Sequence, residues 1–192
     1  MIRLGALVSG GGRTVLNLQD AIDRGTLDAT IDVVVAHAPS IKAVERCQER
    51  GLNVVIVEPA ADAIDEALSA VAVEIVCLAG YLRKFRIAER WRNHAINIHP
   101  SLLPAHGGQG MYGLHVHDSV LLAGDVESGC TVHIADDEYD RGPTLLQRRC
   151  AVLPDDTAES LAARVFEEEC IALPETLAAI DRGEIPLLRS WR

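Results

Sequence analysis

The chain has 192 residues, 48% hydrophobic and 24% charged, ordinary values for a globular protein that folds around its own core without disulfide or metal support. Its 18 basic and 28 acidic residues give a formal net charge of −10, and a surface of that sign argues against a general nucleic-acid binder. The five cysteines stand singly with no CxxC pair, which is typical of a reduced, cytoplasmic protein and argues against a zinc ribbon or a disulfide framework.

Short apolar runs alternate with helix-prone stretches through the first half of the chain. The predicted strands cover residues 2–8, 31–36, 54–57 and 75–79. The predicted helices follow the glycines at 10–12 as far as Gly25 and then cover 42–50 and 62–70. Strands that alternate with helices at this pace indicate right-handed crossovers and a parallel sheet.

The second half of the chain does not continue the regular alternation of strands and helices. The predicted elements are a strand at 95–98, a Gly/Pro-rich loop at 100–113, a helix at 114–123 and extended runs at 128–134 and 144–152. A short acidic link joins the last two runs and permits a hairpin, so we expect a mixed sheet. A final helix, with Thr157 as N-cap, is expected to reach Ile180 with a break near Pro174.

The expected fold is therefore α/β and Rossmann-like, with a mostly parallel central sheet, helices on both faces and an antiparallel portion in the C-terminal half. The N-terminal apolar run is too short for a signal peptide, and no stretch approaches the ~20 apolar residues that span a bilayer. Neither repeats nor a linker interrupt the sequence. We expect one cytoplasmic domain over residues 1–192, with no membrane partner.

The first candidate site is the glycine-rich turn Ser9-Gly10-Gly11-Gly12-Arg13-Thr14, between the first strand and the first helix. Glycines let a backbone approach a ligand closely, and N–H groups at a helix start attract anions. The turn lacks the full GxGxxG spacing of a dinucleotide site and the GK[ST] ending of a P-loop. A phosphate cradle and a plain turn both remain open, and the strand-end position favours the cradle.

The second candidate site is Asn97 and His99, which share one face at the end of a strand that Pro100 stops. An amide N–H can stabilise an oxyanion while an imidazole moves a proton, the minimum set for acyl transfer. The alternative is a capped strand end. Asp140, in the acidic link, would raise the pKa of His99 if it lay nearby, although the link is equally typical of a solvated turn.

The His115-Val116-His117 pair superficially matches the HxH metal pair of hydrolases. It falls in a predicted helix, where residues i and i+2 do not share a face, and no further ligands follow at suitable spacing. We therefore expect no metal site.

Together these segments resemble the folate-dependent glycinamide ribonucleotide formyltransferases. The resemblance rests on NIHPSLLP at 97–104, HIADDEYDRGPTLLQ at 133–147 and AGYLRKF at 79–85, and it runs from the glycine turn to the helix around Glu169. The glycine turn departs from the family's usual Gly-Ser-Asn ending, and the stretch after Pro104, AHGGQGMYG, is longer and richer in glycine than the common form.

The resemblance implies formyl transfer from 10-formyltetrahydrofolate, as co-substrate, to the amine of glycinamide ribonucleotide in purine biosynthesis. Asn97 would stabilise the oxyanion, His99 would be the general acid, and Asp140 would tune His99. The residues implied to bind the nucleotide are Gly11, Gly12, Arg13, Thr14 and Glu169. Those implied to contact folate are Leu82, Arg83, Lys84, Phe85, Asn97, Asp136, Asp137, Glu138, Tyr139 and Asp140.

The sequence is also compatible with other functions. A formyltetrahydrofolate hydrolase or a methionyl-tRNA formyltransferase handles the same formyl group, but each usually carries an additional domain, and the charge of −10 is wrong for tRNA. A non-catalytic nucleotide-binding module would keep the glycine turn without needing Asn97, His99 and Asp140 together. A nicotinamide oxidoreductase is disfavoured by the incomplete fingerprint. The expected partners are the two small-molecule substrates, and the expected state is a monomer or homodimer.

Overall fold

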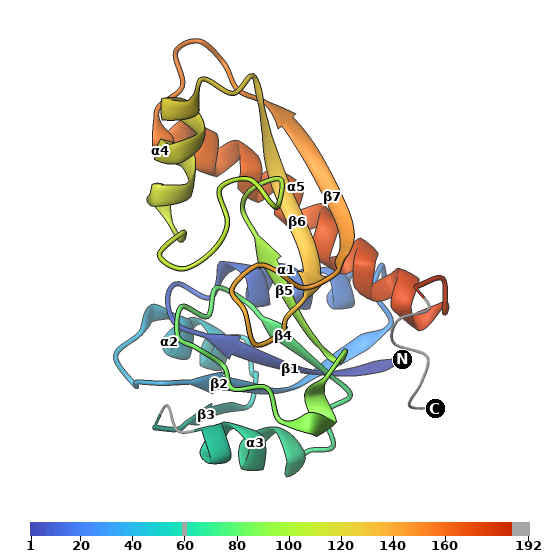
Figure 1. The fold of residues 1–192 in the computed structure, drawn as a ribbon. Helices are drawn as coiled ribbons and strands as arrows, with labels where there is room; N and C mark the ends of the chain where they lie inside the picture. Colours follow the sequence, from blue (N-terminus) through green and yellow to red (C-terminus); the bar gives the residue numbers. More distant parts are fainter. Residues whose placement is uncertain (59–60, 186–192) are drawn as a thin grey trace. The chain divides into compact units, whose positions relative to one another are not determined.

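The computed structural model describes residues 1–58 and 61–185, and the chain forms two compact units. Unit 1 comprises Met1–Ile96 together with the chain from Leu177 onward, and unit 2 comprises Asn97–Thr176. Strand β5 and helix α5 each begin in one unit and end in the other (Figure 1).

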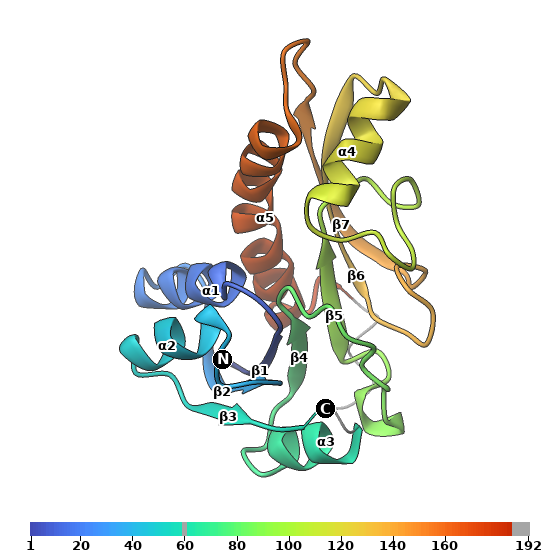
Figure 2. The same cartoon turned by 90° about the vertical axis from the view of Figure 1, so that its left-hand side faces the viewer.

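Unit 1 is built on a parallel sheet with the strand order β3-β2-β1-β4, followed by the start of β5. The strands are β1 Ile2–Val8, β2 Ala29–Ala36, β3 Val54–Ile56, β4 Ile75–Leu78 and β5 Ala95–His99. The helices are α1 Arg13–Asp23, α2 Lys42–Glu49 and α3 Ala61–Ser69, with a short 3₁₀ turn, η1, at Glu89–Trp91. Figure 2 shows α1 and α2 on one face of this sheet and α3 on the other.

The core of unit 1 explains this layering. Strand β1 is buried along almost its whole length, as expected of a central parallel strand covered on both faces. A Cβ at Gly5 would lie 2.5 Å from Leu68 of α3, so the glycine lets that helix approach β1 closely. Helix α1 buries Val15 and Leu18, which follow the helical period, on the opposite side of the sheet.

Unit 2 contains the end of β5, then β6 Glu127–Ile134 and β7 Thr144–Ala151, in the order β5-β6-β7. Strands β6 and β7 pair antiparallel as a hairpin. Helices α4 Leu114–Ala123 and α5 Ala158–Asp181 lie on opposite faces of these strands (Figure 2). Arg148 of β7 anchors α5 through an ion pair with Glu168 at 2.7 Å, and Thr157 Oγ1 accepts the N–H of Ser160 at the helix start.

The predicted fold class is confirmed, because a parallel sheet with helices on both faces is followed by an antiparallel hairpin. The predicted boundaries hold within about two residues. The predicted break near Pro174 is wrong, since α5 is continuous to Asp181 with the proline inside it. Proline removes one helical hydrogen bond, but Leu173 and Leu177 on either side are buried, and their packing outweighs that loss.

No helix in the described part of the chain is long and apolar enough to cross a membrane.

Candidate active site

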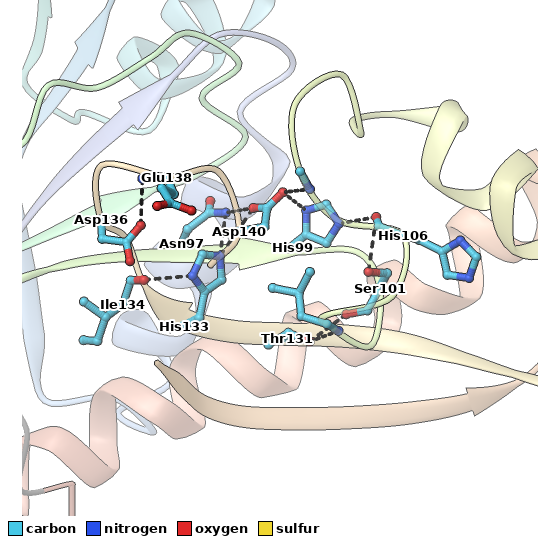
Figure 3. Close-up of polar contacts among 12 residues, drawn as sticks. Asn97, His99, Ser101, His106, Thr131, His133, Ile134, Asp136, Glu138 and Asp140 are labelled. Carbon is cyan, nitrogen blue, oxygen red and sulfur yellow. Dashed lines mark hydrogen bonds and ion pairs between the residues drawn. The ribbon is translucent and has the colours of Figure 1, made fainter. Parts of the chain in front are cut away.

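Strand β5 ends in two polar side chains, Asn97 and His99, that project to the same side (Figure 3). His99 is only 4% exposed and Asn97 is half-buried. The structure thus places both at the carboxyl end of a strand, as the i and i+2 spacing predicts. Their chemical roles stay predictions.

Asp140 reaches these two side chains from the link between β6 and β7. Its backbone is left-handed, with φ 56°, a conformation that aspartate tolerates better than most residues. Oδ2 lies 3.4 Å from Nδ1 of His99 and accepts the N–H of Gly108 at 2.8 Å. Oδ1 accepts from Nδ2 of Asn97 at 3.4 Å. The proximity that sequence alone could not establish is therefore present.

A fourth side chain, His133 of β6, completes the group, although it is not among the residues that the sequence predicts for the site. Its Nδ1 donates to the carbonyl of Ile134 at 2.8 Å, so this nitrogen carries a hydrogen. Its Nε2 lies 3.1 Å from Nδ2 of Asn97 and 3.5 Å from Oδ1 of Asp140. We call Asn97, His99, His133 and Asp140 the Asp140 cluster.

Burial and charge act in opposite directions on His99. Burial lowers the pKa of His99 below the usual range of an imidazole, and the Asp140 carboxylate and the His106 carbonyl offset this only in part. The expected net rise in this pKa is therefore wrong. The direction of the carboxylate's effect is as expected, but the ring is almost entirely buried, and desolvation disfavours its charged form.

The groups around Asp140 keep it ionised as a carboxylate. Burial raises the pKa of Asp140, but the His133 ring 3.5 Å away, the charge of His99 and the N–H of Gly108 outweigh it, so the pKa is lowered overall. A buried carboxylate beside two imidazoles and an amide provides a hydrogen-bond donor, a proton carrier and a fixed negative charge in one group. That set can stabilise an oxyanion and transfer a proton.

The residues described show no group of three or more His, Cys, Asp or Glu side chains placed to hold a metal ion. His115 and His117 lie on α4, a helix as predicted, where residues two apart do not share a face. His117 is buried while His115 is exposed.

The glycine turn of unit 1 joins β1 to α1. Gly12 is left-handed, with φ 72°, and caps the helix without a side-chain hydrogen bond. A Cβ at Gly12 would lie 3.0 Å from both Cα and Cβ of Ala43, so α2 leaves no room for a side chain there. The structure thus explains one of the three glycines by close packing as well as by conformation.

Helix α2 also fixes the peptide groups of this turn. The N–H of Ala43 donates to the carbonyl of Gly10 at 3.0 Å, and the guanidinium of Arg46 donates to the carbonyl of Gly11 at 3.0 Å. In a trans peptide the N–H points away from the carbonyl. The N–H groups of Gly11 and Gly12 therefore both point away from α2, an arrangement of adjacent donors that suits an anion.

The segment expected to line a folate pocket lies beside the glycine turn. The N–H of Leu82 donates to Oγ of Ser9 at 3.0 Å, because β1 and β4 are neighbours that end at the same edge of the parallel sheet. Leu82, Arg83 and Lys84 are exposed, whereas the side chain of Phe85 is buried. A contact between Phe85 and a ligand would therefore come from its backbone.

The remaining predicted residues belong to unit 2. Residues 136–139 form the exposed part of the β6–β7 link, and the N–H of Glu138 donates to the side chain of Asp136 at 2.9 Å. Glu169 lies half-buried on α5, and its charge contributes to raising the pKa of the Cys130 thiol to about 12, after the larger effect of burial.

The whole chain is similar to known proteins. The family described as formyl transferase matches residues 2–177. Phosphoribosylglycinamide formyltransferase, chloroplastic, of Vigna unguiculata is 36% identical and aligns with 98% of this chain and 66% of its own length. The Arabidopsis thaliana protein of the same description is 33% identical, over 99% of this chain and 68% of its own.

Solved structures show the same likeness. The crystal structure of glycinamide ribonucleotide transformylase 1 from Symbiobacterium toebii has a TM-score of 0.87 and 34% identity, and the match covers 95% of this chain and 89% of that one. The chain spans about two thirds of the length of the two plant relatives.

Proposed function

The chain belongs to the formyl transferase family, and we propose that it is a phosphoribosylglycinamide formyltransferase, which moves a formyl group from 10-formyltetrahydrofolate to the amine of glycinamide ribonucleotide in de novo purine biosynthesis. The observation that carries the proposal is the Asp140 cluster. It brings an amide donor and two imidazoles within 3.5 Å of one ionised carboxylate, that of Asp140.

We propose direct attack as the mechanism. The substrate amine forms a bond to the formyl carbon, and the formyl oxygen becomes an oxyanion that the N–H of Asn97 stabilises. The 3.4 Å contact from Asn97 to Asp140 is long for a hydrogen bond, so this N–H can turn to a better acceptor as charge develops.

Collapse of the intermediate then breaks the bond between the formyl carbon and the folate nitrogen. His99, as an imidazolium, gives the proton on Nδ1 to that leaving nitrogen. The proton that the attacking amine loses passes to the Asp140 carboxylate and from there back to Nδ1 of His99, which restores the starting state. The Asp140 carboxylate, 3.4 Å from Nδ1, favours the imidazolium against the opposing effect of burial. His133 would hold the amide of Asn97 in place through the 3.1 Å contact.

The binding residues follow the family resemblance. The nucleotide phosphate would lie on the N–H groups of the glycine turn, at Gly11, Gly12, Arg13 and Thr14, with Glu169 contacting the nucleotide. Folate would contact residues 82–85 and 136–140. Support for the phosphate site comes from α2, which turns the N–H groups of Gly11 and Gly12 to one side.

The remaining expectations stay proposals of the same kind: one domain over residues 1–192, a cytoplasmic location, a monomer or homodimer, and small-molecule partners without nucleic acid.

The test is an absorbance assay for loss of the formyl group from 10-formyltetrahydrofolate, with and without glycinamide ribonucleotide. We expect turnover that needs the nucleotide and yields formylated nucleotide. Loss of formyl to water without the nucleotide would indicate a hydrolase instead. Nucleotide-dependent thermal stabilisation without turnover would indicate a binding module, and either result would overturn the proposal.

A further inference from the structure

The second ring nitrogen of His99 is held by the loop that follows β5. Nε2 of His99 donates to the backbone carbonyl of His106 at 2.9 Å, on the opposite side of the ring from Asp140 (Figure 3). His99 therefore has an acceptor at each nitrogen. Both contacts are favourable only when both nitrogens carry hydrogen, which is the imidazolium form.

The carbonyl that does this belongs to a residue with an uncommon backbone. His106 has φ 53°, in the left-handed region that residues with a side chain rarely adopt. Such a conformation persists only where the surroundings hold it. In this loop the hydroxyl of Ser101 donates to the carbonyl of Ala105 at 2.6 Å and, more weakly, to that of His106 at 3.5 Å.

The side chain of His106 supplies a second restraint. Its Nδ1 lies 2.8 Å from the hydroxyl of Ser119 on α4, and its Nε2 lies 2.7 Å from Oδ2 of Asp125, just after that helix. The side chain is only 13% exposed. A ring bonded at both nitrogens cannot rotate without losing a contact, so α4 and the residues after it fix where residue 106 lies.

We propose that His106 is a positioning residue for the proposed formyl transfer: its side chain, tied to Ser119 and Asp125, holds the backbone carbonyl that orients His99 as a proton donor. The proposal rests on the proposed function. His106 itself does not touch the reacting atoms in this scheme, and its effect passes through the 2.9 Å bond to His99.

Four ionisable groups face His99, and three of them, Asp140, His133 and His106, contribute to its titration. Asp140 lies on the β6–β7 link, His133 on β6, His117 on α4 and His106 in the loop after β5. The Asp140 carboxylate and the His106 carbonyl favour the charged ring of His99, whereas the imidazoles of His133 and His106 oppose it. Burial and the charge of His99 together lower the pKa of His117. The carbonyl of His106 raises the pKa of His99 more than the charge of the His106 ring lowers it. Displacement of the carbonyl should therefore make His99 give up its proton at a lower pH even in a variant that also lacks the ring.

The experiment compares His106→Asn, Asp125→Ala and His115→Asn with the parent. Asn tolerates the left-handed backbone but is too short to bridge Ser119 and Asp125, and Asp125→Ala removes one anchor without changing residue 106. His115 is an exposed imidazole on α4, the helix that carries Ser119, so His115→Asn is the matched control.

We expect His106→Asn to lower kcat about 10- to 100-fold with little change in either KM, because misorientation of a reacting group affects chemistry more than binding. The alkaline limb of its pH–rate profile should move to lower pH. Asp125→Ala should show the same changes in smaller measure, and His115→Asn neither.

Nitrogen-15 NMR of the imidazole rings provides a readout that needs no turnover. The titration midpoint of His99 should fall in His106→Asn and Asp125→Ala, and stay at the parent value in His115→Asn. If both variants fold, by thermal midpoint, and keep the parent's profile and midpoint, His106 is not a positioning residue. If His106→Asn does not fold, the Asp125→Ala comparison decides alone. If the parent protein has no formyl transfer activity, the proposed function is refuted. The NMR titration would still show whether the His106 side chain controls the hydrogen bond between its carbonyl and His99.

Discussion

Unit 1 and unit 2 build their polar sites from different parts of the chain. The glycine turn of unit 1 offers backbone N–H groups whose direction is set by hydrogen bonds from α2 to two carbonyls. The Asp140 cluster of unit 2 offers side chains that contact one another in a buried group. A backbone site should be sensitive to an added Cβ, and a side-chain site to a change of chemistry at constant shape.

The largest effect should come from the side-chain site. We expect His99→Ala to lower kcat about 10²- to 10⁴-fold, the usual contribution of general acid–base catalysis. Asp140→Asn should cause a loss of similar order, because it removes the charge 3.4 Å from His99 without changing shape. The double variant should lose little more than His99→Ala, since groups that act as a unit are not additive.

The measurement is kcat for both single variants and the double, with His115→Ala as a control for loss of an exposed imidazole. Fully additive losses would show that His99 and Asp140 do not work together.

Asn97→Ala should rank next. Removal of one oxyanion donor costs about 10²- to 10³-fold in kcat, with substrate affinity largely kept. Asn53→Ala is the matched control, because the Asn53 amide donates to the carbonyl of Asp32 in unit 1, outside the Asp140 cluster. Steady-state kinetics and thermal midpoints decide the matter. If Asn97→Ala unfolds without a specific catalytic defect, Asn97 is a strand cap.

The backbone site should respond in KM instead. Gly12→Ala forces a Cβ to within 3.0 Å of Ala43 and should raise the KM of the nucleotide about 10- to 100-fold, the value of a lost hydrogen bond to a charged group. Gly25→Ala is the matched control, since Gly25 has a similar φ of 68° but no neighbour within 4 Å of its Cβ. If the nucleotide KM is the same in Gly12→Ala and Gly25→Ala, the phosphate does not bind at this turn.

The smallest effect is a displacement of the pH–rate profile. Burial lowers the pKa of His99 and the Asp140 carboxylate partly offsets that effect, so Asp140→Asn should lower the pKa of His99 further. Because the imidazolium is the active form, the residual activity of Asp140→Asn should be lost at lower pH than that of the parent. A profile whose alkaline limb does not move would contradict the assigned role of Asp140.

The same contrast explains what the sequence could predict. The alternating strands and helices of unit 1 can be predicted because the spacing of apolar residues and the glycines and prolines that end each element are local features of the sequence. Asn97 and His99 can also be predicted to lie together, because residues i and i+2 of a strand share one face. The predicted break at Pro174 is wrong because the burial of Leu173 and Leu177 outweighs the local effect of the proline.

His133 required tertiary information. It stands in a run of buried strand residues, where an imidazole is most simply explained as core. Its contact with Asn97 spans 36 positions and depends on β6 lying beside β5, which no local pattern specifies. The motif HIADDEYDRGPTLLQ begins at this residue, and that was the available signal. The sequence does not predict the lowered pKa of His99 for a related reason, since the degree of burial is not visible in a sequence.

The hydrogen bonds from α2 to the glycine turn have a thermodynamic consequence. Glycine loses more conformational entropy on ordering than any other residue, so a turn with three in succession would bind an anion weakly if the ligand itself had to order it. Because Ala43 and Arg46 already restrain two of the peptide groups, that ordering occurs when the chain folds. Preorganisation of this kind lets the free energy of anion contact go into affinity, and it makes a neighbouring helix a determinant of binding strength.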